Sequence, residues 1–538
     1  MTSKLENIEP LLEWFAQPSN RSFFNRDVLE VKKSPVSDGV GVFARMNRHA
    51  AVDDEEENVL LRVHKSMVLS PQTCTISNLL CEWMDNVEEM LPLNDMSALV
   101  LAYLFEVSLG EKSPWYVYLQ SFEVGNAMPL CLQDEKRVLS VLRGSEVDVM
   151  GGLDKSELES HYEACVEFAR YVCERTGMEV PSELNGDDLT GFGSVYSCVA
   201  SRAFEVDEYI PLALVPGADL FNHAVGGEGS EHVHFVTLGD VCGVCGKTEC
   251  THREEEEGDE DEEEDEEEMD VDEEDNAEEE EEEDIEELTM DYVVQMEKEL
   301  DEEKQAEEDN DSESEDEDEE EEYDNPEWDP KEMYMDPDEC CDIVIAEGVQ
   351  LVRGREVFNT YGDLPNAVLL AKYGFAIEDN PCESVCLGAE VNAFRREHPE
   401  LEPRWEWWKQ QLEEEEDSDE EEEEDDEEEE SWLLQCRVDA PGVASAALCA
   451  VARLAAMDAS AFEEVETRAL RKKLGKSDVA ARKLVAKWAA QRVAQYSAEG
   501  RSGALLREAR KTKGSGAQRR AALVAVAGEK ALLEKVAK

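Results

Sequence analysis

Hydrophobic and polar residues follow two different periodicities along the chain. Residues 4–16 (KLENIEPLLEWFA) have the spacing of a short amphipathic helix. Residues 23–46 and 59–70 (VLLRVHKSMVLS) alternate as short strands do, with glycines between them. From about residue 76 to 200 the spacing turns helical, in segments that end at Gly110 and Gly177. A helical block therefore follows a group of small strands.

Strand-like patterns return later in the chain, and helical patterns follow them. YIPLALVPGADLFNHA (209–224), EHVHFVTLGDV (231–241) and CCDIVIAEGVQLVRGREVFNTYG (340–362) are predicted as strands and turns. From residue 376 onward the chain is predicted to be mainly helical, with WEWWKQQL (405–412) as its first clear helix after that point. The fold class is therefore α+β, and the strand-forming pieces flank a helical insertion.

Charge changes this picture, because the acidic residues are concentrated in blocks. The 538 residues contain 50 Lys and Arg against 134 Asp and Glu, a formal net charge of −84. Residues 254–288, 301–324 and 413–430 are nearly pure like-charge runs with few apolar side chains, so we expect them to be disordered. Loop closure costs only about 0.6 kcal/mol for each doubling of length, so a hairpin between two strands can carry such an insertion.

The expected organisation follows from these patterns. We predict an N-terminal helix within residues 1–20, a mixed α+β domain at 21–375 and a helical C-terminal domain at 376–538. The middle domain contains the helical insertion at about 76–195 and the disordered acidic insertion at about 253–336. The acidic loop 413–430 bridges the first two helices of the C-terminal domain.

The cellular compartment is predicted from the N-terminus and the cysteines. MTSKLENIEPLLEWF lacks a long apolar segment, and no stretch of about 18 apolar residues follows, so no membrane is expected as a partner. The 15 cysteines, several of them inside apolar runs, are typical of buried thiols in a reducing compartment. We expect a cytoplasmic or nuclear protein, or one found in both.

Three groups of segments line up along the chain: SDGVGVFA (37–44), SRAF with GADLFNHA (201–204, 217–224), and FNTYG with LLAKYGF (358–362, 369–375). Two further segments, EKSPWYVYL (111–119) and EKALL (529–533), accompany them. In these segments the chain resembles the SET-domain lysine methyltransferases, in the branch of the Rubisco large-subunit and ribosomal-protein lysine methyltransferases. That branch has a SET domain of small sheets and a pseudoknot, with a helical insertion and a helical C-terminal domain.

The resemblance implies S-adenosyl-L-methionine as cofactor and assigns roles to residues of this sequence. Tyr361 would be the catalytic tyrosine beside the transferring methyl and the incoming amine, and it would also touch the cofactor. Phe221, Tyr373 and Phe375 would line the substrate channel. Arg202 would bind the methionine carboxylate, for which a bidentate arginine is well suited. The cofactor-binding residues would be Asp38, Val40, Ser201, Arg202, Asp219, Asn222, His223 and Tyr361.

The sequence departs from the family pattern in its first glycine turn and after the histidine. Asp38 and Val40 stand where the branch often has Glu and Leu, and Ala224 follows His223 where a serine is common. Without the serine, one hydroxyl contact near the cofactor is in doubt. The differences therefore bear on cofactor affinity and not on the type of reaction.

The chemistry explains why aromatic residues are needed. The attacking lysine must be neutral, and removing its proton at pH 7 costs about 4–5 kcal/mol because its ordinary pKa is near 10.4. An apolar channel lowers that cost because it desolvates the ammonium form. The run from Phe358 to Phe375 supplies aromatic side chains of this kind.

A cysteine cluster precedes the longest acidic run. GDVCGVCGKTECTHREEEE places Cys242, Cys245, Cys250 and His252 within eleven residues. The Cys-x-x-Cys half fits a zinc knuckle, whereas the Cys-x-His half is tighter than the usual spacings of structural zinc. A structural zinc site and a turn with reduced cysteines both stay open.

The predicted function is transfer of methyl from S-adenosylmethionine to lysines of a protein. The partner is expected to be a basic protein: a ribosomal protein, a translation factor or a histone, drawn in by the acidic runs. Those runs equally fit a spacer, or a segment that folds back on the basic C-terminal helices. An alternative function is an acidic binding protein or chaperone on an inactive SET scaffold. Direct nucleic-acid binding is not expected from so acidic a chain, and a monomer is expected.

Overall fold

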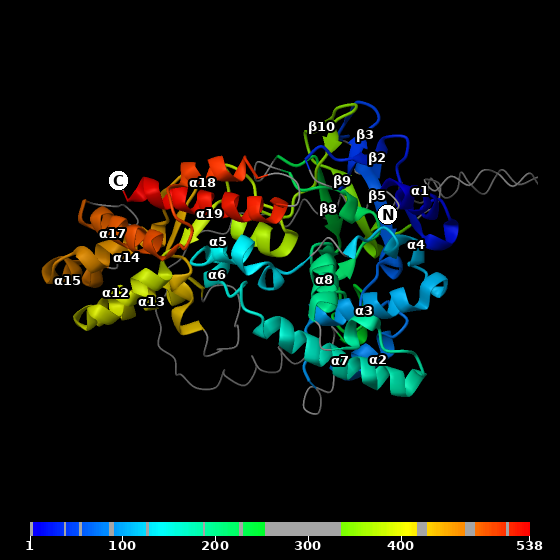
Figure 1. The fold of residues 1–538 in the computed structure, drawn as a ribbon, viewed down its shortest axis with the longest axis horizontal. Helices are drawn as coiled ribbons and strands as arrows, with labels where there is room; N and C mark the ends of the chain where they lie inside the picture. The colour runs from blue at the N-terminus through cyan, green and yellow to red at the C-terminus, as the bar shows by residue number, and fades with distance from the viewer. Residues whose placement is uncertain are drawn as a thin grey trace, which may run out of the picture. The chain divides into compact units, whose positions relative to one another are not determined.

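The structure is a computed structural model, drawn in Figure 1. The chain divides into two units, residues 1–248 with 329–538 and residues 249–328, and of the second only 249–252 are described. Most of the predicted acidic insertion and the central part of the predicted 413–430 loop lie outside the described residues. The structure describes residues 4–36, 39–52, 56–84, 91–124, 128–186, 189–224, 230–252, 335–416, 428–468, 479–512 and 516–537.

A four-stranded antiparallel sheet joins segments from both sides of the insertions. Its strand order is β1–β5–β9–β8, and Val63 of β5 pairs with Cys341 of β9 while Val233 of β8 pairs with Ile345. The acidic run therefore lies between two paired strands, β8 and β9, as the sequence predicted. The strands are β1 (Ser22–Phe24), β5 (Val59–His64), β8 (Val233–Thr237) and β9 (Cys340–Ile345).

Three smaller sheets complete this part of the fold. They are β11–β3–β2, β10–β4 and β6–β7. The prediction of a strand across 209–224 was wrong beyond the two residues of β7, because Pro211 and Pro216 interrupt the backbone pairing there. The strands are β2 (Leu29–Lys33), β3 (Val40–Ala44), β4 (Arg48–His49), β6 (Ala203–Phe204), β7 (Ala213–Leu214), β10 (Gln350–Leu351) and β11 (Glu356–Val357).

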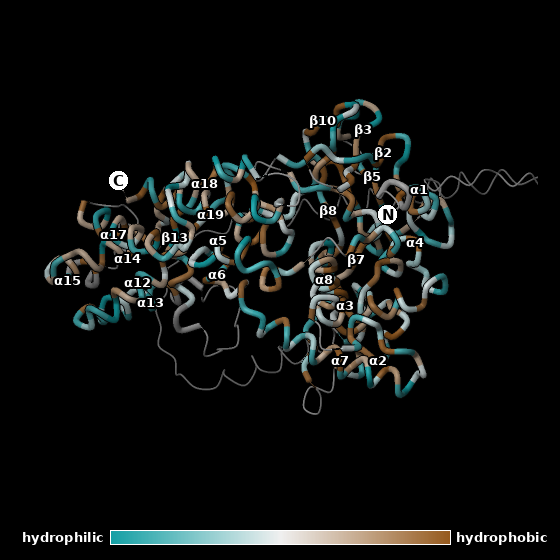
Figure 2. The backbone as a smooth tube through the Cα atoms, in the orientation of Figure 1, coloured by the Kyte–Doolittle hydropathy of each residue, from teal (hydrophilic) through white to brown (hydrophobic). Residues whose placement is uncertain are grey.

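Helices lie along the chain from Ser77 to Ala200 and pack on the strands. Asn94 caps the start of α3, and α3 and α7 end at Gly110 and Gly177. Most of α3 is buried and hydrophobic (Figure 2). The helices are α1 (Lys4–Trp14), which is the predicted N-terminal helix, then α2 (Ser77–Met84), α3 (Asp95–Leu109), α4 (Tyr116–Leu119), α5 (Ser140–Leu142), α6 (Glu146–Val149), α7 (Ser156–Thr176) and α8 (Leu189–Ala200).

The C-terminal part is mainly helical but contains a small sheet that the sequence patterns did not predict. Its strands are β12 (Ser384–Cys386), β13 (Arg437–Asp439) and β14 (Val443–Ala444), in the order β12–β13–β14. Two of them lie between α13 and α14, so the acidic loop does not by itself bridge these helices. The helices are α11 (Asn366–Val368), α12 (Gly388–Glu397), α13 (Glu402–Glu416), α14 (Ala446–Ala456), α15 (Ala459–Arg468), α17 (Val479–Gln495), α18 (Ser502–Ala509) and α19 (Ala517–Val536).

Both ends of the predicted disordered loop 413–430 belong to helical elements. Residues up to Glu416 continue α13, and a 3-10 turn begins at Glu428. Glutamate is a good helix former, so a helix can extend into an acidic run before like-charge repulsion ends it.

Two hydrophobic cores organise the described residues. The first joins α1, the sheets and helices α2–α4, α7 and α8. The second joins the C-terminal helices with residues 130–153 of the helical insertion, so the insertion contributes to both cores. The domain boundaries at 20 and 375 remain a prediction.

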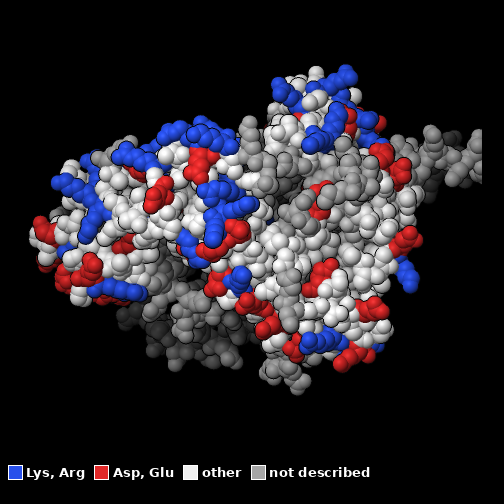
Figure 3. All heavy atoms as spheres, viewed as in Figure 1, with Lys and Arg blue, Asp and Glu red and all other residues white. Residues whose placement is uncertain are grey.

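Charge on the surface differs between the parts. Figure 3 shows Lys and Arg side chains gathered over α18 and α19, where Arg507, Arg510, Lys511 and Arg520 are exposed. None of the described helices is both long and apolar enough to cross a bilayer.

Candidate active site

Tyr361 lies where two distant segments of the chain run side by side. The Asn359 N–H donates to the carbonyl of Asn222 at 3.0 Å, and the Ala224 N–H donates to the carbonyl of Asn359 at 2.7 Å. His223 and Asn359 form a parallel bridge. The Tyr361 N–H donates to Nδ1 of His223 at 3.0 Å. The backbone thus fixes Tyr361 directly against the Asn222–His223 pair.

Tyr361 lies in an aromatic row formed by the rings of His223, Tyr361, Tyr373 and Phe375. Its ring stacks on His223 with a centroid distance of 5.0 Å and on Tyr373 with 4.5 Å. Phe375 lies 6.3 Å from both the His223 and Tyr373 rings. The Tyr361 hydroxyl donates to the carbonyl of buried Phe221 at 3.2 Å. The rings of Tyr361, Tyr373, Phe375 and His223 therefore form one cluster, which Phe221 joins through its backbone carbonyl.

The chain after Tyr361 explains this placement. A short helix, α11, runs into a π-helical turn at Leu369–Tyr373, which ends at Gly374 with φ of +77°. This sharp reversal returns the chain toward the row, so that Tyr373 and Phe375 both face it. Local backbone chemistry thus assembles the aromatic row.

The row is electrically neutral at physiological pH. Burial raises the pKa of Tyr361 well above its ordinary value, and the neighbouring Tyr373 raises it further. Burial also raises the pKa of Tyr373. Burial lowers the pKa of His223, although Asp363 and Glu231 oppose that shift. The phenols therefore remain hydrogen-bond donors, and the imidazole is uncharged.

A second cluster lies at the end of α8. Arg202 pairs with Asp219, with 3.4 Å between Nε and Oδ2. Its Nη1 donates to the Cys198 carbonyl and to the Ser201 hydroxyl, both at 3.1 Å, and its guanidinium lies 5.2 Å from the Phe122 ring centroid. The charges of Arg202 and Asp219 act on the pKa of Tyr361 in opposite directions, so this cluster neighbours the aromatic row.

Asp219 is the most unusual group of this cluster. Its side chain is only 6% exposed, and its Oδ1 makes no hydrogen bond of standard geometry with the described residues, but the buried Tyr118 hydroxyl lies close enough to lower the pKa of this carboxyl. Burial raises its pKa to about 6, and Arg202 counteracts part of that shift. The carboxyl is therefore mostly ionised at pH 7 and has an oxygen available for a further donor.

Asn222 connects this region to the first glycine turn. Its Nδ2 donates to the Val40 carbonyl at 3.0 Å and to Oε1 of Glu356 at 2.6 Å, and Oε2 of Glu356 accepts from Ser34. Gly41 allows this approach, because a Cβ there would lie 2.1 Å from Oε1 of Glu356. The glycine of the turn is thus required by packing against a buried carboxylate.

The predicted residues therefore fall into neighbouring groups, and some important residues were missed. Asp38 lies outside the described residues, while Val40 meets the site through its carbonyl. Sequence patterns did not single out Glu356, Tyr118, Phe122 or Asn359. Tyr118 is fully buried and acts on the pKa of Asp219. Its position inside the EKSPWYVYL segment was the available signal, whereas nothing local marks Glu356.

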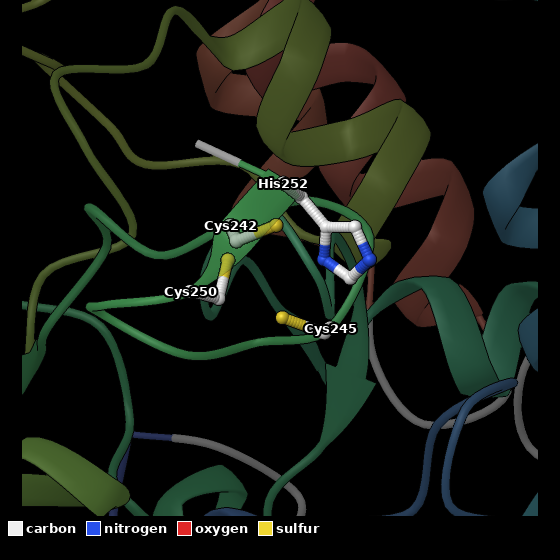
Figure 4. A group of neighbouring side chains, drawn as sticks. All are labelled: Cys242, Cys245, Cys250 and His252. Carbon is white, nitrogen blue, oxygen red and sulfur yellow. The ribbon is translucent and has the colours of Figure 1, made fainter. Parts of the chain in front are cut away.

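The cysteine cluster is also brought together. One ligand atom from each of Cys242, Cys245, Cys250 and His252 lies within 4.8 Å of the others (Figure 4). Cys242 is buried, Cys245 and Cys250 are half-buried, and His252 is exposed.

Comparison with known proteins supports the resemblance that the sequence motifs indicated. No family model matches the chain. It is 28% identical over 427 residues to the ribosomal lysine N-methyltransferase 3 of Saccharomyces cerevisiae, covering 75% of this chain and 68% of that protein. Among solved structures it is similar to the SET domain of LSMT bound to lysine and AdoHcy (TM-score 0.51, 13% identity) and to Rubisco LSMT bound to sinefungin and monomethyllysine (0.52, 14%). Both alignments cover 99% of this chain and 90% of the other.

These similarities support a protein-lysine N-methyltransferase with the SET fold. The α+β fold class and the resemblance to the branch of the Rubisco and ribosomal-protein enzymes are confirmed. As a SET-domain enzyme it catalyses the transfer of a methyl group from S-adenosylmethionine to lysine.

The residues present fit this methyl donor. The methionine part of S-adenosylmethionine carries an ammonium and a carboxylate. Asp219 has a buried carboxylate oxygen that makes no hydrogen bond of standard geometry with the described residues, and the adjacent Arg202 side chain is 25% exposed. A buried carboxylate beside a partly exposed arginine matches a zwitterionic ligand, since each charge then finds its opposite.

Proposed function

We propose that this enzyme methylates lysine side chains of a ribosomal protein or a translation factor. The yeast relative named for ribosomal lysine methylation supports this substrate class. The observation that carries the catalytic part is the position of Tyr361, stacked between His223 and Tyr373 with its hydroxyl on the Phe221 carbonyl.

Tyr361 acts in this proposal as the catalytic tyrosine. Its hydroxyl is held in one direction by the Phe221 carbonyl, and its backbone by His223. A donor or acceptor that is already oriented needs no reorganisation during the reaction, and such groups contribute about 2–4 kcal/mol. His223 is a positioning residue, because its Nδ1 binds the Tyr361 backbone.

Tyr373, Phe375 and Phe221 form the wall of the lysine channel. A lysine ammonium among uncharged rings loses hydration, which lowers its pKa and favours the neutral amine. The neutral state of the row is therefore part of its function. The substrate amine leaves its proton to solvent before it enters the row.

The methyl donor is held by the second cluster. S-adenosylmethionine, when bound, supplies an electrophilic sulfonium methyl. Arg202 and Asp219 bind its methionine end, and Ser201 orients Arg202 through the bond from Nη1. Asn222 supports the Val40 carbonyl and so shapes the glycine turn, in which Asp38 is the remaining proposed contact.

The proposed partner is a basic protein that is attracted electrostatically, because long-range attraction of opposite charge raises encounter rates. The net charge of −84 fits such a partner better than it fits nucleic acid. We propose a monomer that acts in the cytoplasm, the nucleus or both. Histones are the second substrate class.

Transfer of a labelled methyl group tests the proposal. Three proteins are compared: wild type, Tyr361→Phe and Tyr116→Phe. Each is incubated with labelled S-adenosylmethionine and, in separate reactions, with purified ribosomal proteins, translation factors or histones. The control variant Tyr116→Phe alters a half-buried tyrosine of α4. We expect it to label a ribosomal protein or translation factor at the same rate as wild type. Tyr361→Phe should be about 30- to 1,000-fold slower, equivalent to about 2–4 kcal/mol.

Three outcomes would contradict the proposal. Equal rates for Tyr361→Phe and wild type would remove Tyr361 from catalysis. Labelling of histones alone would overturn the substrate class. If wild type labels nothing but retains basic proteins, and deletion of residues 254–324 abolishes retention, the acidic binding-protein function replaces the enzymatic proposal.

A further inference from the structure

Residues 242–247 form a tight turn of the kind that presents two thiolates to one metal ion. The N–H groups of Cys245 and Gly246 both donate to the Cys242 carbonyl, at 3.3 and 2.8 Å, and the Cys242 N–H donates to the Lys247 carbonyl at 2.9 Å. Gly246 has φ of +70°, a conformation that side chains disfavour. The sequence Cys-Gly-Val-Cys-Gly thus closes on itself, with its two sulfurs on the same side (Figure 4).

The second pair of ligands comes from the next few residues. Cys250 and His252 bring a third sulfur and an imidazole to the same point, and all four ligand atoms lie within 4.8 Å of one another. The ligand atoms around a tetrahedral zinc ion with Zn–S bonds of about 2.3 Å are about 3.8 Å apart. A contraction of at most about 1 Å would therefore complete the coordination.

We propose that Cys242, Cys245, Cys250 and His252 bind a structural zinc ion that anchors the loop 205–211 beside the active site. Three thiolates and one imidazole are a set that selects zinc over magnesium or calcium, which prefer oxygen ligands. Four protein ligands leave no open position for a substrate, so the site is structural rather than catalytic.

The turn packs directly against the loop 205–211. A Cβ at Gly246 would lie 2.8 Å from the Tyr209 ring, and one at Gly243 would lie 3.8 Å from the Glu208 carbonyl. Both glycines of the turn therefore face this loop, and Gly246 has no room for a side chain.

The loop 205–211 has a second attachment. Asp207 pairs with Lys65 at 2.8 Å, with side chains that are 2% and 13% exposed, and Lys65 also donates to the Leu238 carbonyl at 2.7 Å. The loop is thus fixed on one side by an ion pair and on the other by the cysteine turn.

The loop also reaches the active site. It begins directly after β6, which follows Arg202, and the charge of Glu205 adds to the effect of burial in raising the pKa of Tyr373 in the aromatic row. Glu205, Asp207, Glu208 and Gly239 line one open hollow. The metal would therefore hold in place an acidic edge next to the lysine channel. This consequence rests on the proposed function, whereas metal binding itself does not.

Metal analysis of the full-length protein tests the site. Protein purified under reducing conditions without added metal is measured by inductively coupled plasma mass spectrometry. We expect stoichiometric zinc in wild type and loss of zinc in Cys250→Ser. The control variant Cys173→Ser, which replaces a half-buried cysteine of α7, should keep its zinc. Cobalt exchanged into wild type should give the intense visible absorption of tetrahedral thiolate coordination. No bound zinc after reconstitution with zinc, or a disulfide between Cys242 and Cys245 in freshly reduced protein, would overturn the site.

Two further measurements test the role of the metal. Removing zinc with a chelator should increase proteolytic cleavage within residues 205–252, and adding zinc should reverse it, whether or not the protein is an active enzyme. In the methyltransfer assay, Cys250→Ser should raise the KM for the protein substrate several-fold and leave the affinity for S-adenosylmethionine unchanged. Unchanged cleavage and KM in a protein that does lose its zinc would overturn the role in the loop.

Discussion

Two buried carboxyl groups, each beside an arginine, differ in what surrounds them. In the candidate active site, Asp219 pairs with Arg202, whose side chain is 25% exposed. In the C-terminal core, Glu529 is fully buried, and the nearby Arg492 is 1% exposed. Burial raises the pKa of Asp219 to about 6 and that of Glu529 to about 8. At pH 7 the first is mostly ionised and the second mostly protonated.

The C-terminal cluster is enclosed by protein groups, although Oε1 of Glu529, like Oδ1 of Asp219, makes no hydrogen bond of standard geometry with the described residues. Arg492 binds Glu146 at 2.7 Å, the Tyr496 hydroxyl donates to Glu529 at 2.7 Å, and the Glu146 N–H donates to the same oxygen at 3.1 Å. The negative charges of Glu146 and Glu383 add to the effect of burial on the pKa of Glu529. The cluster joins α6 of the helical insertion to α17 and α19.

The difference indicates what each cluster is for. A protonated carboxyl in a closed core serves as a hydrogen-bonding element of the fold. An ionised carboxyl with a partly exposed arginine keeps charge available for a ligand. Buried ion pairs seldom add net stability, but losing one partner is costly because the other charge stays buried. The two clusters should therefore respond differently to substitution.

The largest effect is expected from Arg492→Met. It leaves the Glu146 carboxylate without its buried partner, and such losses typically cost about 3–5 kcal/mol. Urea denaturation should show this decrease in the free energy of unfolding. Arg510→Met, which removes an exposed ion pair with Glu378, should unfold almost as wild type does. Equal stability of both variants would mean that the C-terminal cluster is not a closed structural element.

A pH-dependent effect is expected from Glu529→Gln. The folded-state pKa is raised from 4.5 to about 8, so folded wild type keeps a proton that the unfolded chain releases. The free energy of unfolding should therefore fall as pH rises from about 4.5 to 8. The decrease should be a few kcal/mol, because each tenfold difference in proton affinity between the folded and unfolded states corresponds to about 1.4 kcal/mol. Glutamine cannot ionise, and one oxygen can still accept from Tyr496 and Glu146.

The pH profile of unfolding distinguishes the outcomes. The Glu529→Gln profile should be shallower than that of wild type and should keep a smaller slope from Glu383, whose pKa burial raises to about 7. Parallel profiles of the two proteins would show that Glu529 is not protonated in the fold.

Sequence patterns singled out residues that the structure brings together in the candidate site, but they singled out no individual residue of the C-terminal cluster, for a physical reason. Tyr361, His223 and Arg202 lie in short motifs whose order along the chain resembles a known family. Glu146, Glu529 and Arg492 are charged residues in helices, where periodicity suggests an exposed face. Their contacts span more than 340 residues of sequence, and only the packed core makes them partners.

The fold shows the same division between local and long-range information. Helices with clear ends, such as α3 and α7, follow from capping residues, and β8 and β9 follow from alternation. The sheet β12–β13–β14 was missed because each strand has only two or three residues, too few for a period to appear. Glu356 was missed because its burial depends on Ser34 and Asn222, which come from distant segments.

The smallest of the three effects should come from Asp219→Asn, and it tests whether the open cluster is a ligand site. Asparagine keeps the shape but loses the charge that would receive the ammonium of S-adenosylmethionine. A hydrogen bond to a charged group is worth about 1.5–3 kcal/mol, so affinity should fall by about 10- to 150-fold. Titration calorimetry measures this, with Glu378→Gln as a carboxyl variant outside the site.

The pH dependence of binding separates a ligand contact from a structural one. Wild-type affinity should decrease as pH falls through about 6, because protonation of Asp219 removes its charge, while Asp219→Asn should bind with little dependence on pH in this range. Stability should change in the opposite sense: the raised pKa means that the unliganded fold loses stability as pH rises from about 3.8 to 6. If Asp219 were purely structural, stability would depend on pH in this way but the affinity for S-adenosylmethionine would not. Asp219 would then have the same kind of role as Glu529.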